Sequence, residues 1–179
     1  MSALTRLARF NRCLKGPWIT SGHDVQWRFR DNVLTFQCTR SRTDWLHNIF
    51  AVKMDHEGDM VHAGYAILWE SVRFIVDNAV GEAENITIEG FSQGAALATL
   101  AYRHYYLQGK NPKAYVFGSP KVFASKTVMP ELENIQVHGD LVTLLPPWFQ
   151  HAGTRIRLGI KPLIPSFRYH EPDIYRSNL

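Results

Sequence analysis

A serine, an aspartate and a histidine follow one another along this chain in an order that could support acyl transfer. Ser92 lies between Gly90 and Gly94, where an alternating β-branched run gives way to an alanine-rich segment. This pattern is typical of a nucleophile elbow, a sharp strand-to-helix turn that exposes the serine hydroxyl. The following helix would point its first N–H groups toward developing negative charge. Taken alone, the pattern also fits an ordinary strand–helix connection, so a base, an acid and an oxyanion site are required.

A serine hydroxyl is a poor nucleophile unless a histidine takes its proton and a carboxylate orients that histidine. Asp140 follows an expected strand, and the histidines beyond it are His151 and His170, the latter in a loop-like segment near the end of the sequence. Taken singly, such an aspartate is typical of a turn and such a histidine of a surface position. The order Ser92, Asp140, His170, with the acid at a strand end, favours a catalytic triad.

The hydrophobic pattern predicts strands that alternate with helices, which indicates a mainly parallel sheet covered on both faces. Two early strands joined at Asp31-Asn32 predict an antiparallel hairpin at one edge. Ligands of such sheets bind beyond the carboxyl ends of the strands, where Ser92 is expected. The expected elements are strands Val25–Arg30 and Val33–Thr39, helix Thr43–Phe50, loop Met54–Asp59, helix Val61–Val80 ended by Gly81, strand Ile86–Phe91, helix Ser92–Gln108 ended by Gly109, and strands Lys113–Gly118, Ile135–His138 and Arg155–Leu158.

Length and composition limit the class of protein. The 179 residues suffice for one domain with a sizeable core, so we expect a single domain over residues 1–179. The net charge of +4 is mild and scattered, which argues against a nucleic-acid partner. The two cysteines, Cys13 and Cys38, form no disulfide framework and are expected as free thiols. Neither a zinc-binding spacing nor a phosphate-binding glycine loop is present, so no cofactor is expected.

The N-terminal segment carries four cations and no continuous apolar core, so it does not resemble a secretory signal. No apolar run approaches the length of a membrane span, and a cytoplasmic location is expected. Four apolar residues fall near one helical face, namely Leu4, Leu7, Ala8 and Leu14. This pattern favours a basic amphipathic helix packed on the domain, with contact to an anionic lipid surface as the alternative.

Several segments between Val33 and His170 together resemble the class 3 lipase family, the fungal-type triacylglycerol lipases and related esterases. Their order matches the order of the family's motifs, and they span most of the chain. The segments are Phe36-Gln37-Cys38-Thr39, Asp44-Trp45-Leu46, Val61-His62-Ala63-Gly64-Tyr65, the Gly90–Ala98 elbow, Val116-Phe117-Gly118-Ser119-Pro120-Lys121-Val122, Gly139-Asp140-Leu141-Val142, Leu145-Pro146-Pro147 and His151-Ala152-Gly153.

The resemblance implies an α/β-hydrolase three-layer sandwich, with Ser92 as nucleophile, Asp140 as orienting acid and His170 as base. It further implies an oxyanion hole made by the backbone N–H groups of Thr39 and Gln93. His151 and His62 correspond to structural histidines of the family. The chain departs from the family pattern at several places, namely Gln37-Cys38, Phe91, Gln93 and Gly139.

The function implied by the resemblance is that of a serine carboxylic ester hydrolase, acting on lipid esters or on short-to-medium acyl esters. Segment Arg40–Phe50 stands where the fungal lipases carry a lid, and it fits either a mobile lid or a fixed helix. Trp45, Leu145 and Trp148 are candidates to line the acyl pocket, and transient contact with a lipid surface is possible. The alternatives are a non-catalytic binding protein of the same fold, and an acyltransferase or phospholipase that uses the same triad.

Overall fold

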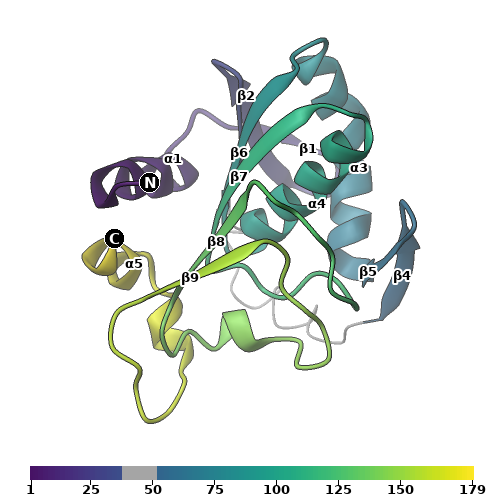
Figure 1. Cartoon of the computed structure of the whole chain (residues 1–179). Coiled ribbons are helices and arrows are strands. Elements are labelled where there is room, and N and C mark those ends of the chain that lie inside the picture. The colour runs from purple at the N-terminus through teal and green to yellow at the C-terminus, as the bar shows by residue number, and fades with distance from the viewer. Residues whose placement is uncertain (38–51) are drawn as a thin grey trace.

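The computed structural model describes residues 1–37 and 52–179, and Figure 1 draws the remaining residues as a thin grey trace. Five predictions concern the segment between these ranges. They are the helix Thr43–Phe50, the lid or fixed helix over Arg40–Phe50, the oxyanion role of Thr39, the acyl-pocket role of Trp45 and the free thiol of Cys38. These predictions therefore lie outside the described residues.

A seven-stranded sheet forms the centre of the molecule, with strand order β1-β2-β3-β6-β7-β8-β9. Strands β3, β6, β7, β8 and β9 pair in parallel, and β1 and β2 add an antiparallel edge. The expected mixed, mainly parallel sheet is therefore confirmed. Its strands are β1 (Ile19–Ser21), β2 (Val25–Arg30), β3 (Val33–Phe36), β6 (Asn85–Phe91), β7 (Asn111–Phe117), β8 (Leu132–Val137) and β9 (Thr154–Leu158).

The predicted hairpin of β2 and β3 is confirmed, and its turn has the expected chemistry. Arg30 pairs with Val33, so the loop contains only Asp31 and Asn32. Both of these residues have positive φ, 51° and 58°, as the favoured two-residue hairpin turn requires. Aspartate and asparagine tolerate this conformation better than most residues, which explains why the turn falls at this point.

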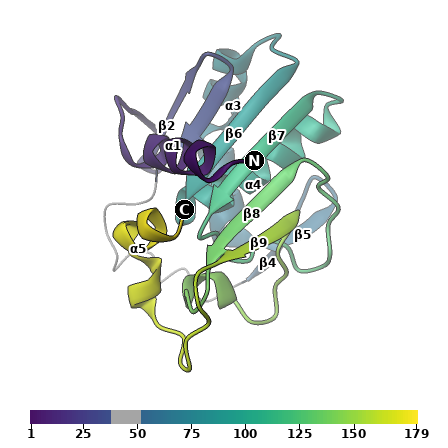
Figure 2. The same ribbon diagram turned by 60° about the vertical axis from the view of Figure 1, so that its left-hand side comes forward.

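Helices cover both faces of the sheet, so the predicted three-layer sandwich is confirmed. Figures 1 and 2 show α3 (Ala63–Val80) and α4 (Gln93–Leu107) on one face, and α1 (Ala3–Leu14) and α5 (Pro172–Asn178) on the other. The larger hydrophobic cluster lies between the sheet and α3 and α4, and a smaller one lies under α1 and α5. Gly81 and Gly109 follow α3 and α4, as predicted.

The prediction of a loop over Met54–Asp59 is wrong. This segment belongs to a separate hairpin, β4 (Lys53–His56) with β5 (Asp59–His62), whose turn is Glu57-Gly58. Both turn residues have positive φ. The segment is polar because its side chains bind the neighbouring helices rather than a sheet core, so the alternation that marks a buried strand is missing.

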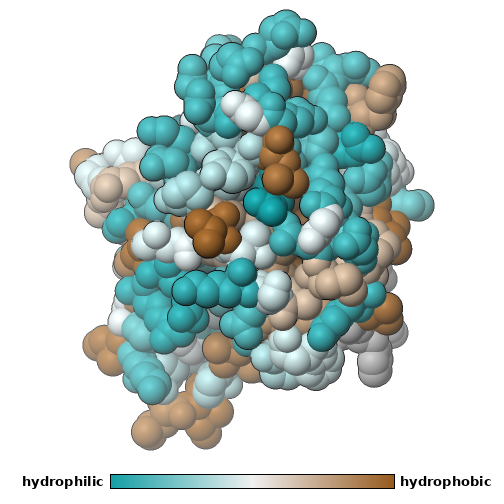
Figure 3. All heavy atoms as spheres, turned by 45° about the vertical axis from the view of Figure 1, so that its right-hand side comes forward, coloured by the Kyte–Doolittle hydropathy of each residue, from teal (hydrophilic) through white to brown (hydrophobic). Residues whose placement is uncertain are grey.

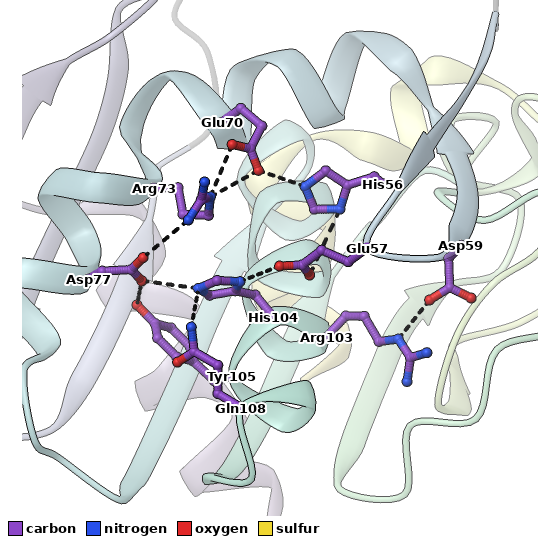
Figure 4. Close-up of polar contacts among 10 residues, drawn as sticks. All are labelled: His56, Glu57, Asp59, Glu70, Arg73, Asp77, Arg103, His104, Tyr105 and Gln108. Carbon is purple, nitrogen blue, oxygen red and sulfur yellow. Dashed lines mark hydrogen bonds and ion pairs between the residues drawn. The ribbon is translucent and has the colours of Figure 1, made fainter.

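Ion pairs and hydrogen bonds join this hairpin to α3 and α4 (Figure 4). The His56 ring donates from Nε2 to Glu70 on α3 at 2.8 Å, and Glu57 accepts from Nδ1 of the buried His104 on α4 at 2.5 Å. Asp59 accepts from Nε of Arg103, also on α4, at 2.7 Å. The side-chain network thus attaches the hairpin together with Val61 of β5 and Met54 of β4, which pack in the larger hydrophobic cluster.

Helix α1 packs on the sheet as predicted, but only part of its predicted apolar face is buried. Leu14 packs against the smaller hydrophobic cluster, whereas Leu4 is exposed, and the fully buried residues of the helix are Phe10 and Cys13. The reason is that two arginines of the helix also face the sheet, where both bind Glu89 of β6. A pattern that assigns every arginine to solvent therefore does not identify the buried face correctly.

Glu89 is fully buried in β6, the strand that leads to Ser92, so the negative charge of its carboxylate must be compensated. Arg12 donates to it from Nε at 2.9 Å and from Nη2 at 2.5 Å, and Arg9 donates from Nη1 at 2.6 Å. The hydrogen bonds to Glu89 raise the pKa of Arg12 above its usual value. Arg9 also lies 4.0 Å from the ring centre of Tyr115.

We expect the double substitution Arg9→Gln and Arg12→Gln to lower the free energy of unfolding by about 3 kcal/mol, because it leaves a buried carboxylate without a counter-charge. Urea denaturation at neutral pH measures this loss. Adding Glu89→Gln to the double variant should recover a large part of it. A triple variant no more stable than the double variant would show that the buried charge is not the cause.

Candidate active site

Ser92 occupies the sharp turn between β6 and α4. Its φ and ψ are 58° and −124°, a conformation that non-glycine residues adopt at a cost of about 1 to 3 kcal/mol. Its N–H donates to the carbonyl of Phe117 on β7 at 3.0 Å, and its own carbonyl accepts from Ala95 at 3.0 Å. The turn is therefore held by the neighbouring strand and by the first turn of the helix, as in a nucleophile elbow.

The two glycines of the elbow are needed because backbones pass too close for a side chain. A Cβ on Gly90 would collide with the carbonyl of Gly94. A Cβ on Gly94 would lie 2.5 Å from the carbonyl oxygen of Phe36 and 2.7 Å from that of Gln37. The end of β3 thus lies directly against the first turn of α4.

The structure brings together the three residues that the sequence selects. Nε2 of His170 lies 2.7 Å from Oγ of Ser92, and Nδ1 of His170 lies 2.8 Å from Oδ2 of Asp140. Because a carboxylate only accepts, Nδ1 carries the proton that it donates to Asp140, and Nε2 is left to accept from the serine hydroxyl. Asp140 is buried, whereas His170 is partly accessible.

Tyr175 is a member of the site that the sequence did not suggest. Its hydroxyl donates to Oδ2 of Asp140 at 2.6 Å and accepts from the N–H of Val137 at 3.3 Å. Burial, followed by the nearby charge of Asp140, raises the pKa of Tyr175 well above its usual value, so the hydroxyl remains a donor. The other carboxylate oxygen accepts from the N–H of Val142 at 2.9 Å. Both oxygens of Asp140 are therefore held in place.

Aromatic rings support the histidine from the side of the sheet that α1 covers. Phe91 stacks on the ring of His170, with centroids 4.9 Å apart and planes 18° from parallel. Phe10 of α1 packs edge-on against Phe91 and stacks on Tyr175. Gly118 leaves room for this arrangement, since a Cβ there would lie 2.9 Å from the Tyr175 hydroxyl and 3.0 Å from Cε1 of His170. The departure from the family pattern at Phe91 thus has a packing role.

The segment around His170 is helical, so its description as a loop is wrong. His170 ends the short 3₁₀ helix η2 (Phe167–His170), and α5 begins two residues later at Pro172. A proline at the first position and Asp173 in the first turn are helix-start signals that the sequence does contain. Recognising them would have placed Tyr175 on a helix that follows the base directly.

His151 does not join the three residues. Its Nε2 donates to the carbonyl of Thr143 at 2.6 Å, and the side-chain amide of Asn134 lies 3.2 Å from its Nδ1. Desolvation is the largest cause that lowers the pKa of His151 to about 4, with the charges of Arg155 and Lys121 acting in the same direction. The ring is therefore neutral near pH 7, and it links the side chain of Asn134 on β8 to the backbone carbonyl of Thr143.

The low pKa of His151 predicts an acid-dependent loss of stability. The unfolded chain takes up the proton at its ordinary value of 6.5, whereas the folded protein does so only near 4. Folding is therefore weakened as the pH falls from about 6.5 to about 4, by about 3 kcal/mol in total. Urea denaturation at pH 7 and at pH 4.5 measures the free energy of unfolding, which should fall less between these pH values in His151→Gln than in the wild type. An equal fall in both proteins would show that His151 is not the cause.

The remaining predicted site residues stand as follows. Gln93 is the first residue of α4, directly after Ser92, and its side chain is almost buried. Leu145 directly follows the 3₁₀ helix η1 (Val142–Leu144), which begins two residues after Asp140. Trp148 lies three residues further along and is 55 % exposed. Their roles as oxyanion donor and acyl-pocket residues remain predictions.

Residues 1–37 and 52–179 contain neither a metal-binding cluster nor a membrane-spanning helix. No group of three or more histidine, cysteine, aspartate or glutamate side chains has a spacing suited to a metal ion. Among the helices of these same residues, none is both long and apolar enough to cross a bilayer.

This arrangement has the parts that nucleophilic catalysis on an acyl group requires. The hydroxyl of Ser92 can give its proton to Nε2 of His170, and the imidazolium that forms lies against the charge of Asp140. The N-terminal end of α4 directs its partial positive charge toward the same hydroxyl.

Comparisons with known proteins agree with this arrangement. The family model described as lipase (class 3) matches residues 33–150. A lipase from Rhizopus microsporus var. chinensis is similar at 21% identity and a TM-score of 0.63, with 81% of this chain and 61% of that chain covered. The Yarrowia lipolytica LIP2 lipase is similar at 20% identity and a TM-score of 0.64, covering 89% of this chain and 80% of that chain.

A third similar structure is the mono- and diacylglycerol lipase from Aspergillus oryzae, at 19% identity and a TM-score of 0.61. Here 72% of this chain and 56% of that chain are covered. This chain thus spans about three fifths of the length of the Rhizopus and Aspergillus proteins. At these identities the structural likeness establishes the fold, and the family match rests on the sequence model.

Proposed function

This chain belongs to the class 3 lipase family, and we propose that it hydrolyses carboxylic esters through Ser92, His170 and Asp140. The observation that carries the proposal is the unbroken series of hydrogen bonds from the Ser92 hydroxyl through both ring nitrogens of His170 to Asp140. Such a series in a strained strand-to-helix turn serves nucleophilic catalysis and has no evident packing purpose.

The first stage forms an acyl-enzyme. Oγ of Ser92 attacks the ester carbonyl carbon while Nε2 of His170 takes the hydroxyl proton, and a tetrahedral intermediate with a negatively charged oxygen results. His170 then gives the same proton to the leaving alkoxide, so that an alcohol departs and an acyl-serine remains. Asp140 stabilises the imidazolium between these two transfers.

The charged oxygen of the intermediate requires hydrogen-bond donors. The backbone N–H of Gln93 is the proposed donor on α4, and the backbone N–H of Thr39 is the proposed second donor. One such donor contributes about 3 to 4 kcal/mol to stabilisation of the transition state. Because Gln93 acts through its backbone, its departure from the family's usual leucine leaves this contribution intact.

The second stage releases the acid. A water molecule gives a proton to Nε2 of His170 and attacks the acyl-serine carbonyl, and a second tetrahedral intermediate forms. His170 returns the proton to Oγ of Ser92 as the carbon–oxygen bond breaks, so the enzyme is regenerated and a carboxylic acid leaves. Over both stages, one ester and one water yield one alcohol and one acid.

We propose lipid esters and other short-to-medium acyl esters as the substrate class. The structurally similar proteins are named as lipases, one of them as a mono- and diacylglycerol lipase. Apolar side chains follow Asp140 along the chain, among them Leu145 and Trp148, and these could bind an acyl chain.

The test is a series of p-nitrophenyl esters from acetate to palmitate, measured with purified protein. We expect turnover that exceeds the background rate for all soluble members and is greatest for short or medium chains. If the protein hydrolysed none of the esters in the series, the proposed activity would be contradicted. A maximum at palmitate would retain the activity but contradict the proposed chain-length preference.

A further inference from the structure

The loop between β9 and η2, residues 159–166, carries strongly exposed aliphatic side chains. Leu163 is completely exposed, Ile160 is 93% exposed and Ile164 is 78% exposed. Figures 1 and 2 show the loop projecting beyond the rest of the fold at the lower end of the molecule. We call residues 159–166 the tip loop.

The tip loop is attached firmly at its base, directly beside the proposed triad. The N–H of Ser166 donates to the carbonyl of Gly139 at 2.9 Å, and a bridge pairs Ser166 with Asp140. The ring of Pro162 packs so closely on Gly139 that a Cβ there would collide with it. His170 lies four residues after Ser166, at the end of η2. The apolar tip is therefore held near the residues that would act on an ester.

The surroundings of the tip loop are basic. Residues 154–170 contain four cationic side chains and neither aspartate nor glutamate. The four are exposed in the structure and comprise Arg155, Arg157, Lys161 and Arg168. Aliphatic side chains flanked by lysine and arginine are the composition that binds anionic lipid surfaces, where the cations meet headgroups and the apolar groups enter the acyl boundary.

More exposed apolar side chains lie on the segment that follows Asp140. Leu144 and Trp148 are each more than one third exposed, and so is Phe167, the first residue of η2 after the tip loop. In Figure 3 the lowest part of the molecule, which Figure 1 identifies as the tip loop, is covered by brown hydrophobic spheres. A tryptophan and a phenylalanine beside the aliphatic tip suit the boundary between headgroups and acyl chains.

We propose that the tip loop inserts into an anionic lipid surface and thereby holds the carboxyl ends of the central strands, where Ser92 lies, against lipid. A narrow convex projection fits a deformable bilayer better than a flat protein surface, and the cations provide complementarity to anionic headgroups. The benefit to the enzyme rests on the proposed function, because only an ester hydrolase gains from being held where lipid esters lie.

The test measures vesicle binding without catalysis. Ser92→Ala protein is mixed with vesicles of phosphatidylcholine containing phosphatidylserine, or of phosphatidylcholine alone, and sedimented at low and high salt. We expect stronger binding to the anionic vesicles, weakened by salt. In the same Ser92→Ala background, the pair Leu163→Asp and Ile164→Asp together should weaken binding to the anionic vesicles at least about tenfold. Lys161→Gln alone should weaken it about fivefold. The matched control is Phe74→Asp, which alters an equally exposed apolar residue on α3 and should leave binding unchanged.

Two outcomes would overturn the inference, namely no binding to anionic vesicles, or binding that the tip-loop substitutions and Phe74→Asp reduce equally. Concentration-dependent self-association that is lost in the Leu163→Asp, Ile164→Asp variant, without vesicle binding, would assign the tip to a second copy instead. Hydrolysis of soluble p-nitrophenyl butyrate by otherwise wild-type protein with the same two substitutions should be unchanged. Loss of vesicle binding and loss of soluble activity are thus measured separately, so the tip-loop inference and the proposed function can fail independently.

Discussion

Replacement of Ser92 by alanine should lower kcat/KM for a soluble p-nitrophenyl ester by about 10⁴-fold or more. The substitution removes the hydroxyl that lies 2.7 Å from Nε2 of His170. Alanine is hardly smaller than serine and keeps the same backbone, so the free energy of unfolding should change by less than about 1 kcal/mol. Steady-state kinetics and urea denaturation measure the two quantities on the same preparation.

The matched control is Ser71→Ala. Ser71 lies on α3, where its hydroxyl donates to the carbonyl of Leu68, and it has no contact with the triad residues. We expect the activity of this variant to equal that of the wild type. If Ser92→Ala retained more than about a tenth of the wild-type activity, another residue would have to be the nucleophile.

Replacement of Asp140 by asparagine should lower kcat by about 10³- to 10⁴-fold. The amide can turn its NH₂ group toward His170, so that Nδ1 must accept instead of donate and Nε2 then carries the proton. A protonated Nε2 cannot take the proton of Ser92. The loss should therefore appear in kcat, while KM for a soluble ester stays within about threefold because Asp140 does not contact the substrate.

Tyr175→Phe provides the graded comparison. It removes one donor from Oδ2 of Asp140 while the bonds from His170 and from the Val142 N–H remain. We expect a reduction in kcat of about tenfold with little change in KM, since the tyrosine positions the carboxylate without touching substrate. Equal losses in Tyr175→Phe and Asp140→Asn would contradict a positioning role for Tyr175.

The sequence predicted those parts of the fold in which local pattern and tertiary environment agree. The strand ending at Phe91 alternates with the period of a β-strand, whereas the segment after it has the composition of a helix. The position of Ser92 at the junction could therefore be predicted from the neighbouring residues alone. Asp140 and His170 were selected by residue type, chain order and family resemblance. Parallel strands β6, β7 and β8 then align their carboxyl ends, which brings the acid close to the serine.

Other features depend on contacts between distant segments, which periodicity does not record. The β4–β5 hairpin is held largely by polar and charged side chains, and β4 therefore lacks a clear apolar alternation. The buried face of α1 includes two arginines because Glu89, about 80 residues away in sequence, is buried beneath them. Tyr175 gains its role only because α5 packs under Asp140. Each of these cases involves a polar group buried through a long-range partner.

Labelling with a fluorophosphonate probe tests the central claim most directly, because the reagent forms a stable bond only with an activated serine. The wild-type protein should gain one phosphonyl group, and peptide mapping by mass spectrometry should place it on Ser92. Ser92→Ala should not react, and His170→Ala should react at least about 100-fold more slowly. An unlabelled wild-type protein, or a label on a different serine, would contradict the account.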